Sequence, residues 1–131
     1  MLEGLLAIKD EAARMRLARY LDCLGRWSPK INPTGARSEE EAFNMLVWPV
    51  LGAEALLTNP VIDVGSGNGS PGLILAALRP ELNITLLEPR AKRWAFLRDV
   101  SREMGVPNVT VRRERSDGYR GRPAATVTVR A

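Results

Sequence analysis

The chain has 131 residues, 45% hydrophobic and 26% charged, the balance of one soluble globular domain. It has no histidine and one cysteine, Cys23, which excludes catalysis by a histidine base, an internal disulfide and most transition-metal sites. The net charge of +4 is uneven, because residues 79–131 hold 12 cations, eleven of them arginine, against six acids. An arginine-rich half suggests a polyanionic partner, although a solvated basic surface explains the charge equally well.

Targeting signals are absent from the sequence. No apolar run approaches the roughly 18–20 residues that span a bilayer, and the first residues lack the basic region and cleavage site of a signal peptide. We therefore expect a cytoplasmic protein with no membrane partner and no bound metal.

The N-terminal part of the chain is predicted to be helical. Apolar residues at helical spacing over 3–25 predict one long helix or two short ones that end near Gly25. Two prolines and a glycine make 27–35 irregular. Ser38 followed by three glutamates predicts a capped helix start, and that helix is expected to run to Pro49 or a little beyond.

From residue 59 onward, strands alternate with helices. Strands are predicted at 61–64, 84–88, 109–112 and 125–130, and helices at 71–78 and 91–104. This alternation predicts a parallel sheet of right-handed βαβ units, which is an α/β fold of the Rossmann type. We therefore expect an N-terminal helical segment (1–58) packed on a Rossmann-like half (59–131), within a single domain.

A glycine-rich turn from Asp63 to Gly72 carries the strongest functional signal. Gly65, Gly67 and Gly69 lie at a strand-to-helix turn, where glycine lets a ligand approach the backbone closely. The third glycine comes one residue too early for the dinucleotide fingerprint, and the Lys-Ser/Thr of a phosphate-binding loop is missing. A nucleoside-type cofactor without a pyrophosphate fits this loop better.

Carboxylates follow two of the other predicted strands. Glu88 ends the second strand, 21 residues after Gly67, where it could accept hydrogen bonds from both ribose hydroxyls. Asp117 lies just past the third strand, where it could accept from an adenine amino group. With Asp63 and Arg130, these residues lie at the carboxyl ends of predicted strands, where open α/β sheets bind ligands. A tight turn without a ligand is the alternative for the glycine pattern alone.

The motifs resemble those of the glucose-inhibited division protein B family, the bacterial small-subunit rRNA guanine-N7 methyltransferases. The resemblance rests on 61–72, 85–88 and 91–97, on Trp27, Asn32 and Thr34 upstream, and on Arg115-Ser-Asp117 and Val129-Arg130-Ala131 downstream. It implies a Rossmann-like class I methyltransferase fold with S-adenosylmethionine as cofactor. It further implies small-subunit ribosomal RNA as partner, with methylation of a guanine in the 530 loop of 16S rRNA.

The resemblance also implies a set of site residues. Cofactor binding would fall to Asp63, Gly65, Ser66, Gly67, Gly69, Glu88, Ser116 and Asp117, and substrate binding to Arg115, Arg130 and Asn32. No catalytic base is expected, because guanine N7 carries an exposed lone pair that attacks the sulfonium methyl directly. A chain without histidine can perform this reaction by aligning the two reactants.

The sequence departs from the family pattern before the first strand. Met45, Trp48 and Pro49 take the places of a His-x-x-Asp-Ser segment, and we count four strands where a complete enzyme has seven. The chain thus resembles a shortened, divergent member. Two alternatives stay open: a catalytically inactive cofactor- or RNA-binding module, and a methyltransferase with a smaller substrate.

Two features of the C-terminal half bear on partners. The arginines Arg112, Arg113, Arg115, Arg120 and Arg122 favour RNA over a small substrate, with a solvated loop as the alternative. In the usual order of such sheets the fourth strand lies beside the first, so 125–129 would form an unprotected apolar edge. We therefore expect either a homodimer through this strand or a fragment of a longer protein.

Overall fold

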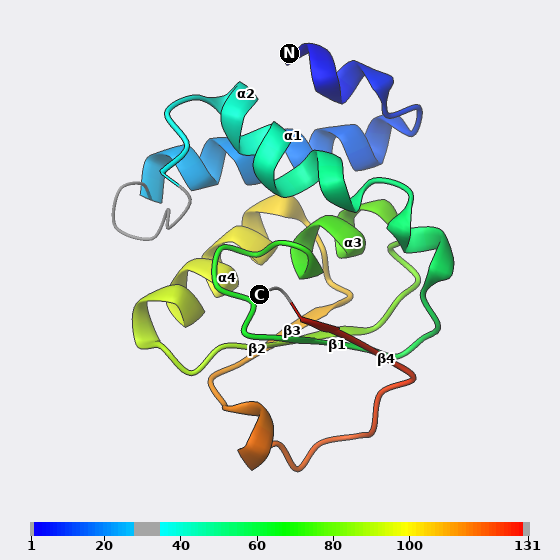
Figure 1. Cartoon of the computed structure of the whole chain (residues 1–131), viewed down its shortest axis with the longest axis vertical. Helices are drawn as coiled ribbons and strands as arrows, with labels where there is room; N and C mark the ends of the chain where they lie inside the picture. The colour runs from blue at the N-terminus through cyan, green and yellow to red at the C-terminus, as the bar shows by residue number, and fades with distance from the viewer. Residues whose placement is uncertain (1, 28–34, 130–131) are drawn as a thin grey trace.

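A computed structural model describes residues 2–27 and 35–129 and contains a four-stranded parallel sheet (Figure 1). The strands are β1 (Val61–Val64), β2 (Ile84–Leu87), β3 (Val109–Arg112) and β4 (Thr126–Val129). Their order is β3-β2-β1-β4, and each neighbouring pair is parallel. The predicted α/β fold of the Rossmann type is confirmed, as is the place of the fourth strand beside the first.

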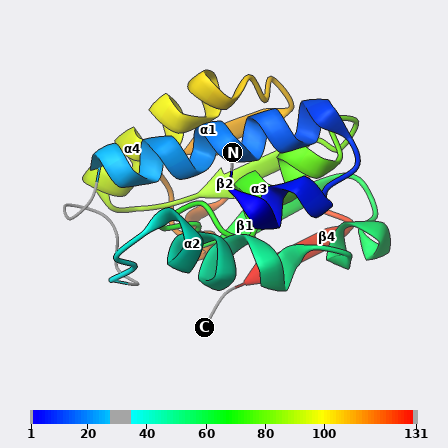
Figure 2. The same ribbon diagram turned by 90° about the horizontal axis from the view of Figure 1, so that it is seen from above.

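Helices cover one face of the sheet. The α-helices are α1 (Glu11–Trp27), α2 (Glu39–Ala42), α3 (Gly72–Leu78) and α4 (Ala91–Met104). Before β1 lie the 3-10 turns η1 (Glu3–Ala7), η3 (Trp48–Val50) and η4 (Ala53–Leu56) and the π-helical turn η2 (Phe43–Val47). A further 3-10 turn, η5 (Ser116–Gly118), lies between β3 and β4. Figures 1 and 2 show α1, α3 and α4 above the sheet, while the segment between β3 and β4 passes below it. Within 2–27 and 35–129, no helix is long and apolar enough to cross a membrane.

The N-terminal helices differ from the prediction in where they begin and end. The helical region is in two pieces, and α1 begins after Asp10, whose carboxylate accepts from the backbone N–H groups of Ala12 and Ala13. Helix α1 includes Gly25 and ends two residues beyond it, at Trp27. The predicted Ser38 cap is confirmed, since its Oγ accepts from the Glu41 N–H at 3.1 Å.

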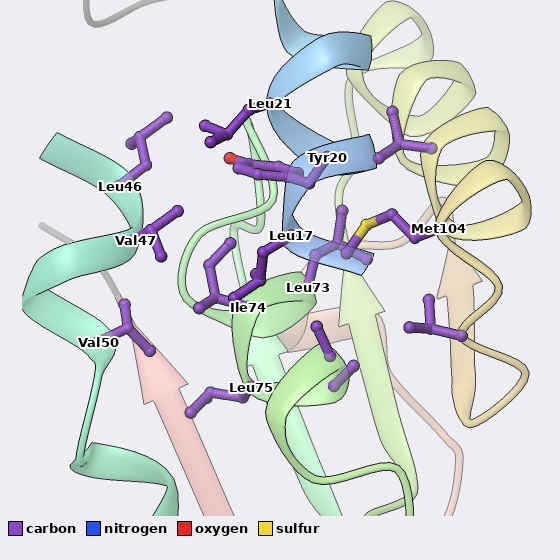
Figure 3. Close-up of a cluster of buried hydrophobic side chains, with 14 of the residues drawn as sticks. Leu17, Tyr20, Leu21, Leu46, Val47, Val50, Leu73, Ile74, Leu75 and Met104 are labelled. Atoms are coloured by element: carbon purple, nitrogen blue, oxygen red, sulfur yellow. The ribbon is translucent and has the colours of Figure 1, made fainter. Parts of the chain in front are cut away.

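The hydrophobic core lies between the helices and one face of the sheet. Side chains from α1, η2 and α3 meet there, among them Leu17, Tyr20, Leu46 and Leu73 (Figure 3). Successive strand residues point to opposite faces, so the other face carries alternate residues such as Val127, which is 59% exposed. The sheet therefore has one well-covered face.

A cavity of about 490 Å³ lies against this second face. Its lining includes Asn59, Asn83 and Asn108, which precede the first three strands, and Tyr119 and Arg122 from the segment before β4. It thus lies toward the amino ends of the strands, away from the glycine-rich turn.

Cys23 is buried. Its Sγ donates a hydrogen bond to Oε2 of Glu103 at 2.9 Å, across the contact between α1 and α4. Burial, together with the Glu103 carboxylate, raises the pKa of the thiol to about 12. At neutral pH the residue is a packed thiol rather than a nucleophile.

Candidate cofactor site

The glycine-rich turn begins at a carboxylate inside the protein. Asp63 is 0% exposed; its Oδ1 accepts from Thr128 Oγ1 at 2.7 Å and its Oδ2 accepts from the Gly72 N–H at 3.2 Å. These contacts join β1 to β4 and to the first turn of α3. The structure therefore places Asp63 as a support beneath the loop, with both carboxylate oxygens engaged by protein.

Backbone hydrogen bonds hold the loop against the end of β2. The N–H groups of Gly65 and Ser66 both donate to the carbonyl of Leu87, at 2.9 and 3.1 Å. Gly65 has a φ of 66°, and a Cβ placed on it would meet nothing within 4 Å. The loop is therefore anchored on one side and open on the other, the arrangement that a ligand lying on the backbone requires.

Glu88 meets this loop at the carboxyl end of β2. Its side chain is 0% exposed, and Oε1 accepts from the Gly67 N–H at 3.0 Å. Arg90 supplies the other donors: its backbone N–H and Nε reach Oε2 at 2.9 and 3.1 Å, and Nη2 reaches Oε1 at 3.3 Å. The structure thus brings together the loop and the carboxylate that the sequence predicted as its partner.

The two carboxylates of the site ionise differently. Burial raises the pKa of Asp63, although hydrogen bonds from Thr128 and Gly72 act in the opposite direction. Burial also disfavours the charge on Glu88, but hydrogen bonds from Arg90 and Gly67 outweigh it and hold the pKa of Glu88 below its usual range. Glu88 is therefore an ionised acceptor at neutral pH.

The N-terminal helices fix the far side of the loop. Tyr20 of α1 is 0% exposed, and its hydroxyl donates to the carbonyl of Asn68 at 2.8 Å. Ser70 Oγ donates to the carbonyl of Leu46 in η2 at 2.7 Å. The shape of the loop consequently depends on α1 and η2 as well as on the sheet.

The other predicted site residues have no recorded contact with the glycine-rich turn or lie outside the described residues. Ser116 and Asp117 lie in the exposed turn η5, where Asp117 Oδ1 accepts from Arg115 Nε at 3.4 Å. In Figure 1 this turn lies below the sheet. Asn32 and Arg130 lie outside the described residues.

The predicted arginine cluster is divided among several contacts. Arg113 Nε donates to the carbonyl of Pro89, beside Glu88, at 3.2 Å. Arg112 pairs with Glu114 on the segment that follows β3, and Arg122 lines the cavity at the amino ends of the strands. These three arginines therefore reach different parts of the chain.

Sequence reasoning missed several residues of the site. Besides Tyr20 and Arg90, it missed Arg93, whose Nη1 would lie 3.3 Å from a Cβ placed on Gly67. A signal for Arg93 exists in the sequence, since it lies three and four residues before Phe96 and Leu97 on the buried stripe of α4. A charge on an inward stripe indicates that this end of the helix meets polar groups.

We expect Asp63→Asn to raise the free energy of unfolding at neutral pH by about 1 kcal/mol, because it removes a buried charge. The new amide can accept from Gly72 and donate to Thr128. Burial raises the pKa of Asp63 in the folded wild type above its unfolded value of 3.8. The contribution of Asp63 to wild-type stability is therefore fully present below pH 3.8 and is lost as the pH rises through the folded-state pKa. Urea unfolding of both proteins from about pH 4 to 8 measures this. A variant that is less stable at every pH would contradict the expectation.

The parallel sheet, the glycine-rich turn and the carboxylate that follows β2 together define a Rossmann-like fold of the methyltransferase type. The family model described as rRNA small subunit methyltransferase G (GidB) matches residues 13–131. The chain belongs to this family.

Curated relatives carry the same description. The chain is similar to ribosomal RNA small subunit methyltransferase G of Neisseria gonorrhoeae (strain NCCP11945), with 39% identity over 127 residues that cover 93% of this chain and 60% of the relative. The corresponding protein of Sodalis glossinidius is 37% identical, covering 90% and 60%, and that of Halorhodospira halophila is 36% identical, covering 99% and 63%. The chain thus spans about 60% of the length of the relatives it matches.

Proposed function

We propose that this chain binds S-adenosylmethionine, with Glu88 accepting hydrogen bonds from the ribose hydroxyls. The observation that carries the proposal is the junction of Glu88 with the glycine-rich turn, through the 3.0 Å hydrogen bond from Gly67. An ionised carboxylate has only acceptor sites, and a ribose diol offers two donors. The open side of Gly65 leaves room for the ligand next to this carboxylate.

The other site residues take roles around that contact. The loop residues Gly65, Ser66, Gly67 and Gly69 would line the methionine and ribose portions, with Asp63 supporting the loop from inside. Ser116 and Asp117 would meet the adenine. No metal is part of the proposal, and no group of three or more potential metal ligands occurs in the described part of the chain.

We further infer that the substrate is small-subunit ribosomal RNA, methylated on N7 of a guanine in the 530 loop of 16S rRNA. Arg115, Arg130 and Asn32 would contact the guanosine or its phosphate. The cofactor supplies a methyl group on a sulfonium. The chain's own contribution is to hold the two reactants in line and to exclude water, because N7 needs no base to remove a proton.

Glu88→Gln should weaken binding of S-adenosylhomocysteine at least tenfold, about 1.4 kcal/mol. The amide keeps the size of the side chain and one acceptor, but it cannot accept from two hydroxyls and Gly67 together. Titration calorimetry on both proteins measures the change. Glu81→Gln is the matched control, since Glu81 is exposed and pairs with Arg79 away from the loop.

Binding that is unchanged in Glu88→Gln would remove the ribose assignment. Transfer is tested separately, by incubating the chain with labelled cofactor and 16S rRNA and locating 7-methylguanine by mass spectrometry. Label in the 530 loop supports the full proposal.

A catalytically inactive binding module is the second candidate. It is favoured by Met45, Trp48 and Pro49, which stand in place of the family's His-x-x-Asp-Ser segment, and Trp48 is 60% exposed. Tight binding of S-adenosylhomocysteine without any methyl transfer to RNA would establish this candidate.

We also propose that the chain forms a homodimer through β4. Among the described residues β4 pairs with β1 alone, and Val127 and Val129 on it are 59% and 67% exposed. An open apolar edge pairs readily with another strand. Antiparallel pairing with β4 of a second copy about a two-fold axis gives a closed, self-complementary interface.

Val127→Lys should convert the dimer to a monomer, because the charge lies in the paired, apolar patch. Sedimentation velocity measures the mass. Leu6→Lys is the matched control: Leu6 is also 59% exposed but lies in η1 on the helical side. A wild-type chain that sediments as a monomer would contradict the dimer.

A further inference from the structure

Arg90 occupies the positions on Glu88 that a ribose would need. Oε1 of Glu88 accepts from the Gly67 N–H and from Arg90 Nη2, and Oε2 accepts from the backbone N–H and Nε of Arg90. A carboxylate has about four acceptor positions. All four are filled, two of them by the backbone and two by one guanidinium.

The guanidinium of Arg90 donates to one acceptor position on each carboxylate oxygen of Glu88. Nε lies 3.1 Å from Oε2 and Nη2 lies 3.3 Å from Oε1, so Arg90 presents two parallel donors to Glu88. A vicinal cis-diol presents two donors in the same way. The guanidinium and a ribose therefore compete for the same pair of acceptors, while the backbone bonds from Gly67 and Arg90 can stay in place.

The guanidinium can leave, whereas the carboxylate cannot. The Arg90 side chain is 59% exposed and that of Glu88 is 0% exposed. Arg90 precedes the first residue of α4, and its side chain makes no capping hydrogen bond to that helix. Swinging into solvent costs the arginine one ion pair, which water partly replaces.

We propose that the Arg90 guanidinium occupies the ribose-accepting positions of Glu88 in the free protein and sets cofactor affinity by competing with the ribose. This inference rests on the proposed function, because it takes Glu88 to be the ribose acceptor. Ligand binding exchanges the guanidinium for the two hydroxyls. Weakening the Arg90–Glu88 pair therefore strengthens binding of adenosine ligands.

The test is titration of wild type and Arg90→Gln with S-adenosylhomocysteine, at low and at high salt. We expect the variant to bind about three- to tenfold more tightly, and added salt to strengthen binding to wild type but not to the variant. Lys92→Gln is the matched control, since it removes one exposed charge from the same helix end. Its affinity should stay close to that of wild type.

A second ligand separates competition from a general change in the site. 2′,3′-Dideoxyadenosine lacks the diol, so its affinity should be the same in wild type and Arg90→Gln. If wild type binds S-adenosylhomocysteine and Arg90→Gln binds it no more tightly, the inference is overturned and the proposed function stays intact. No binding by either protein overturns both, and equal tightening for both ligands overturns the competition.

Discussion

Gly72→Ala should lower the free energy of unfolding by about 3–5 kcal/mol. A Cβ at this position would lie 2.6 Å from Oδ2 of Asp63 and would overlap Cδ2 of Leu86, and both neighbours are fully buried. Moving Asp63 away to make room for the Cβ would break the hydrogen bond from the Gly72 N–H to its buried carboxylate. Since a domain of this size has about 5–15 kcal/mol of stability, the loss is a large fraction of the total.

Gly25→Ala is the control for the same chemical change. Gly25 lies inside α1, and a Cβ there would meet nothing within 4 Å. Alanine is the better helix former, so this variant should gain up to about 1 kcal/mol. Urea unfolding midpoints of the two variants and wild type give the comparison. Equal midpoints for the two variants would show that the contact between β1 and α3 is looser than the structure indicates.

Local sequence signals predicted the elements around the site. Ser38 caps its helix because its hydroxyl acts within one turn, on Glu41. Glu88 meets Gly67 because the carboxyl ends of parallel neighbouring strands share one edge of the sheet, which follows from the alternation of strands and helices. Such features depend on spacing along the chain, which the sequence displays directly.

Features that depend on distant parts of the chain were not predictable in the same way. The motif predicts that Asp63 faces a ligand, yet one of its carboxylate oxygens accepts a hydrogen bond from Thr128, 65 residues later in the chain. The continuation of α1 through Gly25 reflects packing against α4, which propensity does not report. Tyr20 and Asn68 are 48 residues apart, and nothing in either local sequence indicates that they meet.

Tyr20→Ala should lower the free energy of unfolding by about 3–5 kcal/mol, because it empties the space of a fully buried ring. The ring packs among Leu17, Leu21 and the α3 side chains in Figure 3. Tyr20→Phe keeps the ring and removes the hydroxyl, which leaves the buried carbonyl of Asn68 without this donor and should cost about 1–2 kcal/mol. Thermal and urea unfolding separate the two contributions.

The phenylalanine variant also tests how far the N-terminal helices shape the cofactor loop. Without the bond to Asn68, the turn that carries Gly67 and Gly69 is less ordered before binding, so S-adenosylhomocysteine affinity should fall along with stability. Tyr119→Phe is the control, because that hydroxyl donates to the carbonyl of Arg122 in an exposed segment, at 2.9 Å. It should leave both quantities nearly unchanged. If Tyr20→Phe loses stability but keeps full affinity, α1 contributes to the fold without preorganising the loop.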